Sequence, residues 1–341
     1  MKDHIGVITV AIDSGPLTSG HSVRGIGVNT RELLRGFKLV SHKDIQITEV
    51  NFSKEDLSKY DIVHYQYFRP FFIDLPFVKP ANKVILTIHD LIPLIYPEHY
   101  PSGIKGKINF LINKYLIRKN VDVIITISET SKKDICRFLR FDPKKIHVVY
   151  LAPRPIFRKL KIENWESEIK QRHGLPDCFA LYVGDVNYNK NIPTLIEVCK
   201  IANIPLVIAG KQAREIENIN LNHPELIHLK SLDWSNVKRL GFVSDEDLVK
   251  IYNLATVYIQ PSLYEGFGLP ALEAVVCGTP LAIAKSQCMV EVLGVGFNYC
   301  DPNDAKSMAN AMLNPNQNKK LPRDYSWEKT ASETLKVYRS H

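Results

Sequence analysis

Short apolar runs rich in β-branched residues alternate with helical patterns along almost the whole chain, and no other feature limits the fold as strongly. The alternation predicts an α/β protein made of parallel, doubly wound sheets with helices on both faces. In such sheets, ligands bind at the carboxyl ends of the strands. The expected strands cover residues 4–12, 44–50, 61–65, 83–89, 122–127, 145–151, 179–184, 204–210, 239–243, 256–261 and 279–284.

A segment rich in proline and charge, residues 152–177, separates two series of strands and marks the expected linker. A chain of 341 residues is long for one hydrophobic core and ordinary for two. We therefore predict one domain over residues 1–160 and a second over residues 161–325. Two such domains facing across a cleft would bring both sets of strand ends to one ligand.

The composition argues against several classes of protein. No apolar run approaches the ~18 residues that a membrane-spanning helix needs, and the first residues lack the cleavage site of a signal peptide. The six cysteines are scattered without a C-x-x-C pair, which favours reduced core thiols over disulfides or a zinc site. We therefore expect a cytoplasmic protein.

Charge is distributed unevenly between the two halves. Residues 1–164 contain 26 Lys and Arg against 16 Asp and Glu, a net charge of +10, whereas residues 165–341 contain 18 against 20, a net charge of −2. A basic half beside a near-neutral half suggests an anionic partner for the first domain. The alternative is a solvated surface that happens to be rich in lysine.

Two glutamates stand eight residues apart in the apolar, glycine-interrupted stretch LYEGFGLPALEAVVCGTPLAI, residues 263–283. Pro270 suits the first position of a helix, which places Glu265 in the loop before that helix and Glu273 within its first turn. Both carboxylates could then face one pocket beside the free N–H groups of the helix. The alternative is a buried strand, turn and helix in which Glu273 only complements the helix dipole.

A short glycine turn, SVRGIGVNTRELL, follows the first strand and leads into a helix. Gly25 and Gly27 would let the backbone approach a ligand at the start of that helix, although a plain tight turn is the simpler explanation. The full G-x-G-x-x-G pattern does not follow this strand, which argues against a nicotinamide or flavin cofactor. No cofactor is therefore expected.

Five motifs stand in order along the chain: RGIGVNTRELL, LTIHDLIP, TISETSKKDI, YVGDVNYNKNIPTLIEV and the stretch over residues 240–280 that contains both glutamates. Together they resemble the retaining, nucleotide-sugar-dependent glycosyltransferases of family four, and LTIHDLIP resembles their mannosyltransferase-like branch. The resemblance implies the GT-B architecture of two Rossmann-like domains, with the acceptor on the first and the nucleotide sugar on the second. It also implies that residues 326–341 form a terminal helix that crosses back to the first domain.

The resemblance assigns donor-binding roles to the region of the two glutamates. Glu265 matches the family glutamate near the hydroxyls of the transferred sugar, and Glu273 matches the one that accepts hydrogen bonds from the ribose. Phe267, Gly268 and Leu269 match the turn whose backbone N–H groups meet the sugar and the pyrophosphate. A helix N-terminus suits a diphosphate, and carboxylates are fixed acceptors for sugar hydroxyls.

The other motifs supply further matches by resemblance. His89 matches a histidine that faces the donor sugar, although a strand-terminal His-Asp can also be a structural pair. Gly27 matches the glycine near the donor phosphate and the acceptor, and Lys190 matches the lysine that binds the diphosphate, where an ordinary exposed lysine is the alternative. Ser128 and Glu129 match a serine-acidic pair, for which a simple helix N-cap is an equally good explanation.

The sequence departs from the family at one contact. Family members usually pair the lysine with an arginine, but the two positions where that arginine stands hold Asp185 and Asn189 here. A cationic contact to the leaving group is thus missing or supplied elsewhere, and Lys211 and Arg24 are the candidates. Loss of a charge-assisted contact costs about 1.5–3 kcal/mol, so slow turnover or an altered donor is an open consequence.

The resemblance implies a retaining hexosyltransferase that uses a nucleoside-diphosphate sugar, either GDP-mannose or a UDP-sugar, with mannose as the favoured sugar. The expected acceptor is a carbohydrate or a lipid-linked glycan in the synthesis of bacterial surface polysaccharide, such as lipopolysaccharide. No D-x-D element stands in a metal-ready context, so no divalent metal is expected. Two alternatives remain open: a non-catalytic subunit that binds a sugar nucleotide, and an epimerase or phosphorylase of the same fold.

One helical segment of the basic half, residues 103–120, interleaves cations with apolar side chains. Its apolar residues are expected to pack on the sheet. The alternative is peripheral contact of the cations with an anionic membrane at its inner face. Nucleic acid is not an expected partner, because no basic motif with interleaved aromatic residues supports it.

Overall fold

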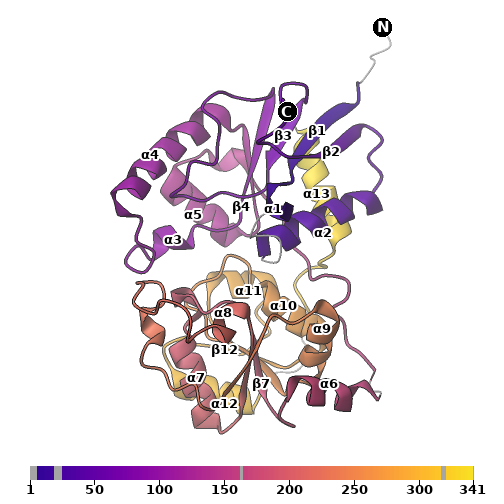
Figure 1. Cartoon of the computed structure of the whole chain (residues 1–341). Helices are drawn as coiled ribbons and strands as arrows, with labels where there is room; N and C mark the ends of the chain where they lie inside the picture. Colours follow the sequence, from indigo (N-terminus) through magenta and orange to yellow (C-terminus); the bar gives the residue numbers. More distant parts are fainter. Residues whose placement is uncertain (1–5, 19–24, 162–163, 316–319, 341) are drawn as a thin grey trace. The chain divides into compact units, whose positions relative to one another are not determined.

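The computed structural model describes residues 6–18, 25–161, 164–315 and 320–340, and the chain divides into two compact units (Figure 1). The first unit contains residues 1–97, 102–152 and 325–341, and the second contains residues 98–101 and 153–324. The chain therefore enters the second unit and returns to the first one near its end. The short segment Glu98–Pro101 also belongs to the second unit, which nothing in the sequence indicates.

The first unit is built on a six-stranded parallel sheet in the order β2-β1-β3-β4-β5-β6. Strands β3, β4 and β5 consist almost entirely of buried residues, as expected for strands covered by helices on both faces. The strands are β1 (Ile8–Asp13), β2 (Ile45–Val50), β3 (Ile62–Tyr65), β4 (Lys83–Ile88), β5 (Val123–Thr126) and β6 (Ile146–Val148). The helices are α1 (Gly15–Thr18), α2 (Gly25–Leu39), α3 (Ile92–Ile95), α4 (Gly103–Asn120), α5 (Glu129–Leu139) and α13 (Trp327–Arg339).

Helix α13 packs against α2 of the first unit, although the whole second unit lies between them in the sequence. The contact is close at Gly36, where a Cβ atom would lie 2.6 Å from the carbonyl oxygen of Trp327. Tyr338 Oη lies 2.7 Å from Nδ1 of His64, and the Nε2 atom of that ring lies 2.7 Å from Oγ1 of Thr87. Burial lowers the pKa of His64 to about 3, so the ring is neutral and serves as a structural link between α13 and the sheet.

The second unit repeats the architecture with the sheet order β12-β11-β10-β7-β8-β9. Its strands are β7 (Ala180–Val183), β8 (Leu206–Ala209), β9 (Val237–Gly241), β10 (Val257–Gln260), β11 (Leu281–Ala284) and β12 (Tyr299–Cys300). Its helices are α6 (Trp165–His173), α7 (Ile192–Ala202), α8 (Lys211–Arg214), α9 (Asp245–Leu254), α10 (Leu269–Cys277), α11 (Gln287–Leu293) and α12 (Ala305–Leu313). The strand order reverses direction at β7 and β10, and loops after these two strands meet at the carboxyl edge of the sheet.

The boundary between the units differs from the expected one. It falls between Ala152 and Pro153, eight residues before the predicted end of the first domain. Nine residues of the expected linker form α6, whose Ile169 is fully buried, so the charged residues of this helix lie on the outer side of a packed element. The two-residue strand β12 was not predicted, because so short a strand leaves no periodic pattern.

Helix α4 corrects a second expectation. Its apolar residues are expected to pack on the sheet, and Ile112 and Leu116 do contact the core, but Ile104, Ile108, Leu111 and Tyr115 are exposed. The buried face of α4 combines small, amide and apolar side chains: Gly106, Asn113, Leu116, Ile117 and Asn120. In the described part of the chain, no helix combines the length and the apolar character that crossing a membrane requires.

Candidate functional site

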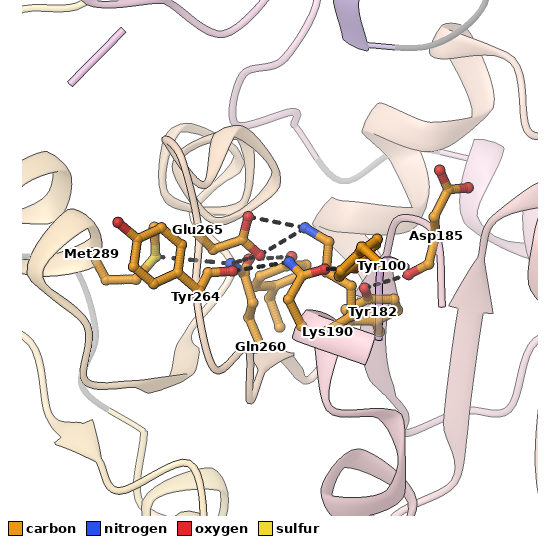
Figure 2. Close-up of polar contacts among 10 residues, drawn as sticks. Tyr100, Tyr182, Asp185, Lys190, Gln260, Tyr264, Glu265 and Met289 are labelled. Atoms are coloured by element: carbon orange, nitrogen blue, oxygen red, sulfur yellow. Dashed lines mark hydrogen bonds and ion pairs between the residues drawn. The ribbon is translucent and has the colours of Figure 1, made fainter. Parts of the chain in front are cut away.

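The centre of the candidate site is an ion pair between a lysine and a glutamate that follow two adjacent strands (Figure 2). Lys190 ends a short helical turn, Tyr188–Lys190, in the loop after β7, and Glu265 lies in the loop after β10. Nζ of Lys190 donates to both carboxylate oxygens of Glu265, at 2.8 and 2.9 Å. Because β7 and β10 are neighbours in a parallel sheet, both side chains meet at its carboxyl edge.

Two buried residues of β10 form a chain of hydrogen bonds that ends at Glu265. Nε2 of Gln260 donates to Oε1 of Glu265 at 3.0 Å, and the hydroxyl of Tyr258 donates to Oε1 of Gln260 at 2.8 Å. Burial raises the pKa of Tyr258 well above its usual value, with further upward contributions from the two glutamates, so its hydroxyl remains protonated and available as a donor. This chain of hydrogen bonds fixes the amide orientation of Gln260 and presents its N–H group to the carboxylate of Glu265.

Asn189, at one of the two positions where the resemblance would place an arginine, is buried in the same region, and its side chain makes hydrogen bonds to neutral groups. Its Nδ2 group donates to the carbonyl oxygen of Tyr264 at 3.0 Å, and its Oδ1 atom accepts from the hydroxyl of Tyr100 at 2.8 Å. Its backbone carbonyl accepts from the N–H group of Leu263 at 2.8 Å. Asn189 therefore ties the segment Glu98–Pro101 to the loop that carries Glu265.

Helix α10 begins directly after this loop. Gly268 is its N-cap residue with φ of +81°, a left-handed backbone conformation that favours glycine, and a Cβ atom on it would lie 1.8 Å from Cε of Met289, so the end of that side chain would have to move. Phe267 is buried, and Leu269 is the first helical residue. The backbone N–H groups at the start of α10 are thereby presented a few residues from Glu265, the arrangement that binds anions at helix N-termini.

Glu273 lies deeper in the helix than the sequence predicts. It is the fifth residue of α10 and not in the first turn, because the helix starts at Leu269 and Pro270 occupies its second position. The hydroxyl of Tyr252 donates to Oε2 of Glu273 at 3.2 Å, and Nη2 of Arg154 lies 3.7 Å from Oε1. Burial raises the pKa of Glu273 to about 7, while Arg154 and Tyr252 act in the opposite direction.

The remaining candidates of the second unit lie outside this cluster. The Lys211 side chain is 72% exposed and its nearest recorded carboxylate is that of Glu215, at 3.9 Å. Figure 2 shows the carboxylate of Asp185 pointing away from Lys190, while the backbone carbonyl of Asp185 accepts from the hydroxyl of Tyr182 at 2.7 Å. Arg24, the other suggested substitute for the missing arginine, lies outside the described residues.

The candidate site residues of the first unit lie in segments that follow strands of its sheet. His89 comes directly after β4, is partly buried, and has its pKa lowered to about 4 by burial, so the ring is neutral at physiological pH. Its carbonyl oxygen accepts from Oγ of Ser131 at 2.8 Å. Gly27 is buried as the third residue of α2, so the expected glycine turn is already helix. Ser128 is the N-cap of α5 and accepts from the N–H group of Ser131 at 3.0 Å.

Sequence reasoning missed four residues of the second unit that contact or orient the two glutamates: Tyr258, Gln260, Tyr252 and Arg154. One signal was present, since Gln260 is a polar residue at the end of an otherwise apolar strand. The others could not be found, because their contacts depend on which distant segments meet in the fold. The described residues contain no group of three or more His, Cys, Asp or Glu side chains arranged to hold a metal ion.

Comparison with known families assigns most of the chain. The model of glycosyl transferases group 1 matches residues 164–331, and the model of glycosyltransferase family 4 matches residues 21–152. The first match contains Lys190 and both glutamates, and the second contains Gly27 and His89.

Two curated relatives are mannosyltransferases of Escherichia coli. O-antigen chain mannosyltransferase B is 26% identical over 291 residues, which are 76% of this chain and 70% of that protein. Serotype-specific mannosyltransferase WbdA is 28% identical over 251 residues, which are 70% of this chain but only 30% of that protein. The chain thus spans about a third of the length of WbdA.

Solved structures support the fold. Sucrose-phosphate synthase from Thermosynechococcus elongatus has a TM-score of 0.62 at 18% identity and is matched over 97% of this chain and 98% of that one. Anabaena Alr3699/HepE, solved with UDP-glucose, has a TM-score of 0.62 at 13% identity and is matched over 97% and 95%. With two parallel-sheet units and matches to both glycosyltransferase models, this chain belongs to the family 4 glycosyltransferases and has the GT-B fold.

Proposed function

We infer that the protein transfers mannose from GDP-mannose to a hydroxyl group of a growing glycan, with retention of configuration at the anomeric carbon. The observation that carries this inference is the Lys190–Glu265 pair beside the N-terminus of α10. It combines a cation and backbone N–H groups suited to a diphosphate with a fixed carboxylate suited to sugar hydroxyls. The choice of mannose rests on the two mannosyltransferases of E. coli to which the chain is similar, and the nucleotide donor agrees with the UDP-glucose bound in HepE.

Transfer would proceed without a protein nucleophile. The C1–O bond of the donor breaks with its electron pair leaving on the nucleoside diphosphate, the acceptor oxygen forms its bond to C1 on the same face, and the acceptor proton passes to the departing phosphate. Lys190 and the N–H groups of Gly268 and Leu269 stabilise the charge that develops on the diphosphate. Glu265 holds the sugar through its hydroxyls, and Glu273 accepts hydrogen bonds from the ribose.

For this transfer, Lys190 and Glu265 must contact the donor while they remain hydrogen-bonded within the site. Nζ of Lys190 has three hydrogens, and its two contacts to Glu265 leave one for a phosphate oxygen. Gln260 continues to donate to Glu265 when sugar hydroxyls bind, which keeps the carboxylate in position. In this assignment His89, in the first unit, contacts the donor sugar as a neutral ring.

The acceptor is proposed to be a lipid-linked glycan of a surface polysaccharide, reached by peripheral contact with an anionic membrane. This agrees with the O-antigen chain mannosyltransferase of Escherichia coli to which the chain is similar. No divalent metal is assigned to the reaction, because Lys190 and the helix N-terminus supply positive potential to the diphosphate.

The test is a screen of GDP-mannose, UDP-glucose and other nucleotide sugars for thermal stabilisation, since a ligand at ~100 times its Kd adds about 2.7 kcal/mol of stability. The stabilising sugar is then incubated with a soluble oligosaccharide acceptor, and the product linkage is read by NMR. We expect stabilisation by GDP-mannose, release of nucleoside diphosphate and an α-linked product.

Other outcomes separate the alternatives. Binding without transfer to any acceptor would indicate a non-catalytic subunit. Release of sugar 1-phosphate, or conversion of the donor in the absence of an acceptor, would indicate a phosphorylase or an epimerase. Stabilisation by UDP-glucose alone would contradict the assignment of mannose.

A further inference from the structure

The outer face of α4 carries an apolar stripe that the core does not use. Ile104, Ile108, Leu111 and Tyr115 are between 52% and 82% exposed. Their spacing of four, three and four residues places all four side chains on one face of the helix. Figure 1 shows α4 along the outside of the first unit. The core contact of α4 is made by the opposite face, so the stripe needs another explanation.

Cations flank the stripe on both sides. At 100° per residue, Lys107, Lys114 and Arg118 lie on one side of it, and Lys105 and Lys119 lie on the other. The helix contains no aspartate or glutamate. This pattern of an apolar stripe between two rows of cations is that of a helix that lies in the interface of an anionic bilayer.

A loop bound to α4 carries more exposed apolar side chains. The side-chain amides of Asn109, Asn113 and Asn120 donate to backbone carbonyl oxygens of residues 69–76, at distances between 2.7 and 3.4 Å. The acidic side chain within this bound stretch, Asp74, is paired with Arg69. The loop and the residues that follow it expose four further apolar side chains: Phe72, Ile73, Phe77 and Val78.

We propose that the outer face of α4, with the loop over residues 69–78, is the surface by which the protein lies on an anionic lipid bilayer. The proposal deepens the proposed function, because it names the surface that would bring the site to a lipid-linked acceptor. Isoleucine and leucine insert between acyl chains, while lysine and arginine contact lipid phosphates. A second copy of this chain is a poorer occupant, because five cations on each α4 would face one another.

Co-sedimentation of the full chain with vesicles tests the proposal. One set of vesicles contains phosphatidylcholine alone, and the other contains equal parts of phosphatidylcholine and phosphatidylglycerol, each at low and high salt. We expect binding to the anionic vesicles at low salt and loss of most of that binding at high salt.

Two variants and two matched controls locate the surface. Ile108→Ser/Leu111→Ser removes the centre of the stripe, and Lys105→Gln/Lys107→Gln removes two cations; each should lower vesicle binding by roughly tenfold. The controls make the same changes at exposed sites of the second unit: Val295→Ser/Leu313→Ser and Lys306→Gln/Lys320→Gln. The controls should bind vesicles as the wild type does.

Several results would overturn the proposal. These are equal binding to neutral and anionic vesicles, no binding at low salt, or wild-type binding by both α4 variants. Self-association that disappears in Ile108→Ser/Leu111→Ser would assign the surface to a second copy instead. Because vesicle binding needs no donor and no turnover, and transfer to a soluble acceptor needs no vesicle, failure of the membrane surface and failure of the proposed transferase activity can be told apart.

Discussion

The ammonium group of Lys190 contacts both carboxylate oxygens of Glu265, and this pair joins the loops that follow β7 and β10. In the proposed donor complex the lysine is assigned to the diphosphate and the glutamate to the sugar. The ion pair holds both groups in place before the donor arrives, and it leaves one hydrogen of Nζ for a phosphate oxygen of the donor.

Glu265→Gln separates these tasks. The amide keeps the shape of the side chain but loses the charge that binds Lys190, so affinity for free nucleoside diphosphate should be at least as high as in the wild type. Turnover should fall by roughly ten- to a hundredfold, because a charged hydrogen-bond partner of the sugar is lost. Calorimetric titration with the nucleotide and initial rates at saturating donor measure the two quantities, with Glu333→Gln as an exposed control. Weakened nucleotide binding with unchanged turnover would contradict the assignment.

Glu273 should make stability depend on pH. Its folded-state pKa of about 7 lies above the ordinary value of 4.5, so the unfolded chain releases this proton first as the pH rises. The stability that protonated Glu273 contributes is full below about pH 4.5 and is lost as the pH rises to about 7, a change on the order of 3 kcal/mol.

Chemical denaturation of the wild type and of Glu273→Gln at a series of pH values measures this effect. The glutamine variant retains a side chain of the same size but cannot titrate, so the difference in unfolding free energy between the two proteins should change over this range and level off on either side. A difference that is constant across the range would show that the carboxyl of Glu273 is not buried in solution.

Tyr100→Phe tests the link between Asn189 and the loop of Glu265. Removing the hydroxyl leaves the buried Oδ1 atom of Asn189 without its donor from Tyr100, which costs about 1–3 kcal/mol of stability. Because Asn189 also binds the carbonyl of Tyr264, we expect KM for the donor to rise more than kcat falls. Tyr115→Phe, at an exposed position, is the matched control. Unchanged stability and unchanged KM would show that the Tyr100 contact does not position the loop.

Transfer should survive excess EDTA. The proposed site assigns the charge of the diphosphate to Lys190 and to the N–H groups at the start of α10, neither of which depends on a divalent ion. Initial rates before and after chelation give the answer. Activity that disappears with EDTA and returns with manganese or magnesium would show that the diphosphate site is assigned wrongly.

The two sheets and the family could be predicted from the sequence, because parallel strands buried on both faces leave long apolar runs and the motifs stand at strand ends. The start of α10 was predicted one residue late, since Pro270 fits the first and the second helical position equally well. The expectation that the apolar residues of α4 pack on the sheet is confirmed for Ile112 and Leu116 and wrong for the exposed stripe, because periodicity shows that apolar residues share a face but not whether the core lies there. Asn109, Asn113 and Asn120 of α4 bind the loop over residues 69–76, whereas the exposed apolar stripe lies on the opposite face of the helix.

The hydrogen bonds around Glu265 and Glu273 could not be predicted from motifs. Tyr252 and Glu273 are 21 residues apart and meet only because α9 packs against α10. Tyr100 and Asn189 are 89 residues apart and meet because a four-residue segment, Glu98–Pro101, joins the second unit. Contacts of this kind depend on the whole fold.

The return of the chain to the first unit has a consequence for biosynthesis. A ribosome completes strands β1 to β6 long before it makes α13, so the surface around Gly36 and His64 stays uncovered while the entire second unit is translated. Domains tend to fold in order of synthesis, but here the earlier unit receives its last helix only after the later one has been made. A nonsense mutation that spares all of the second unit would still deprive the first unit of part of its core.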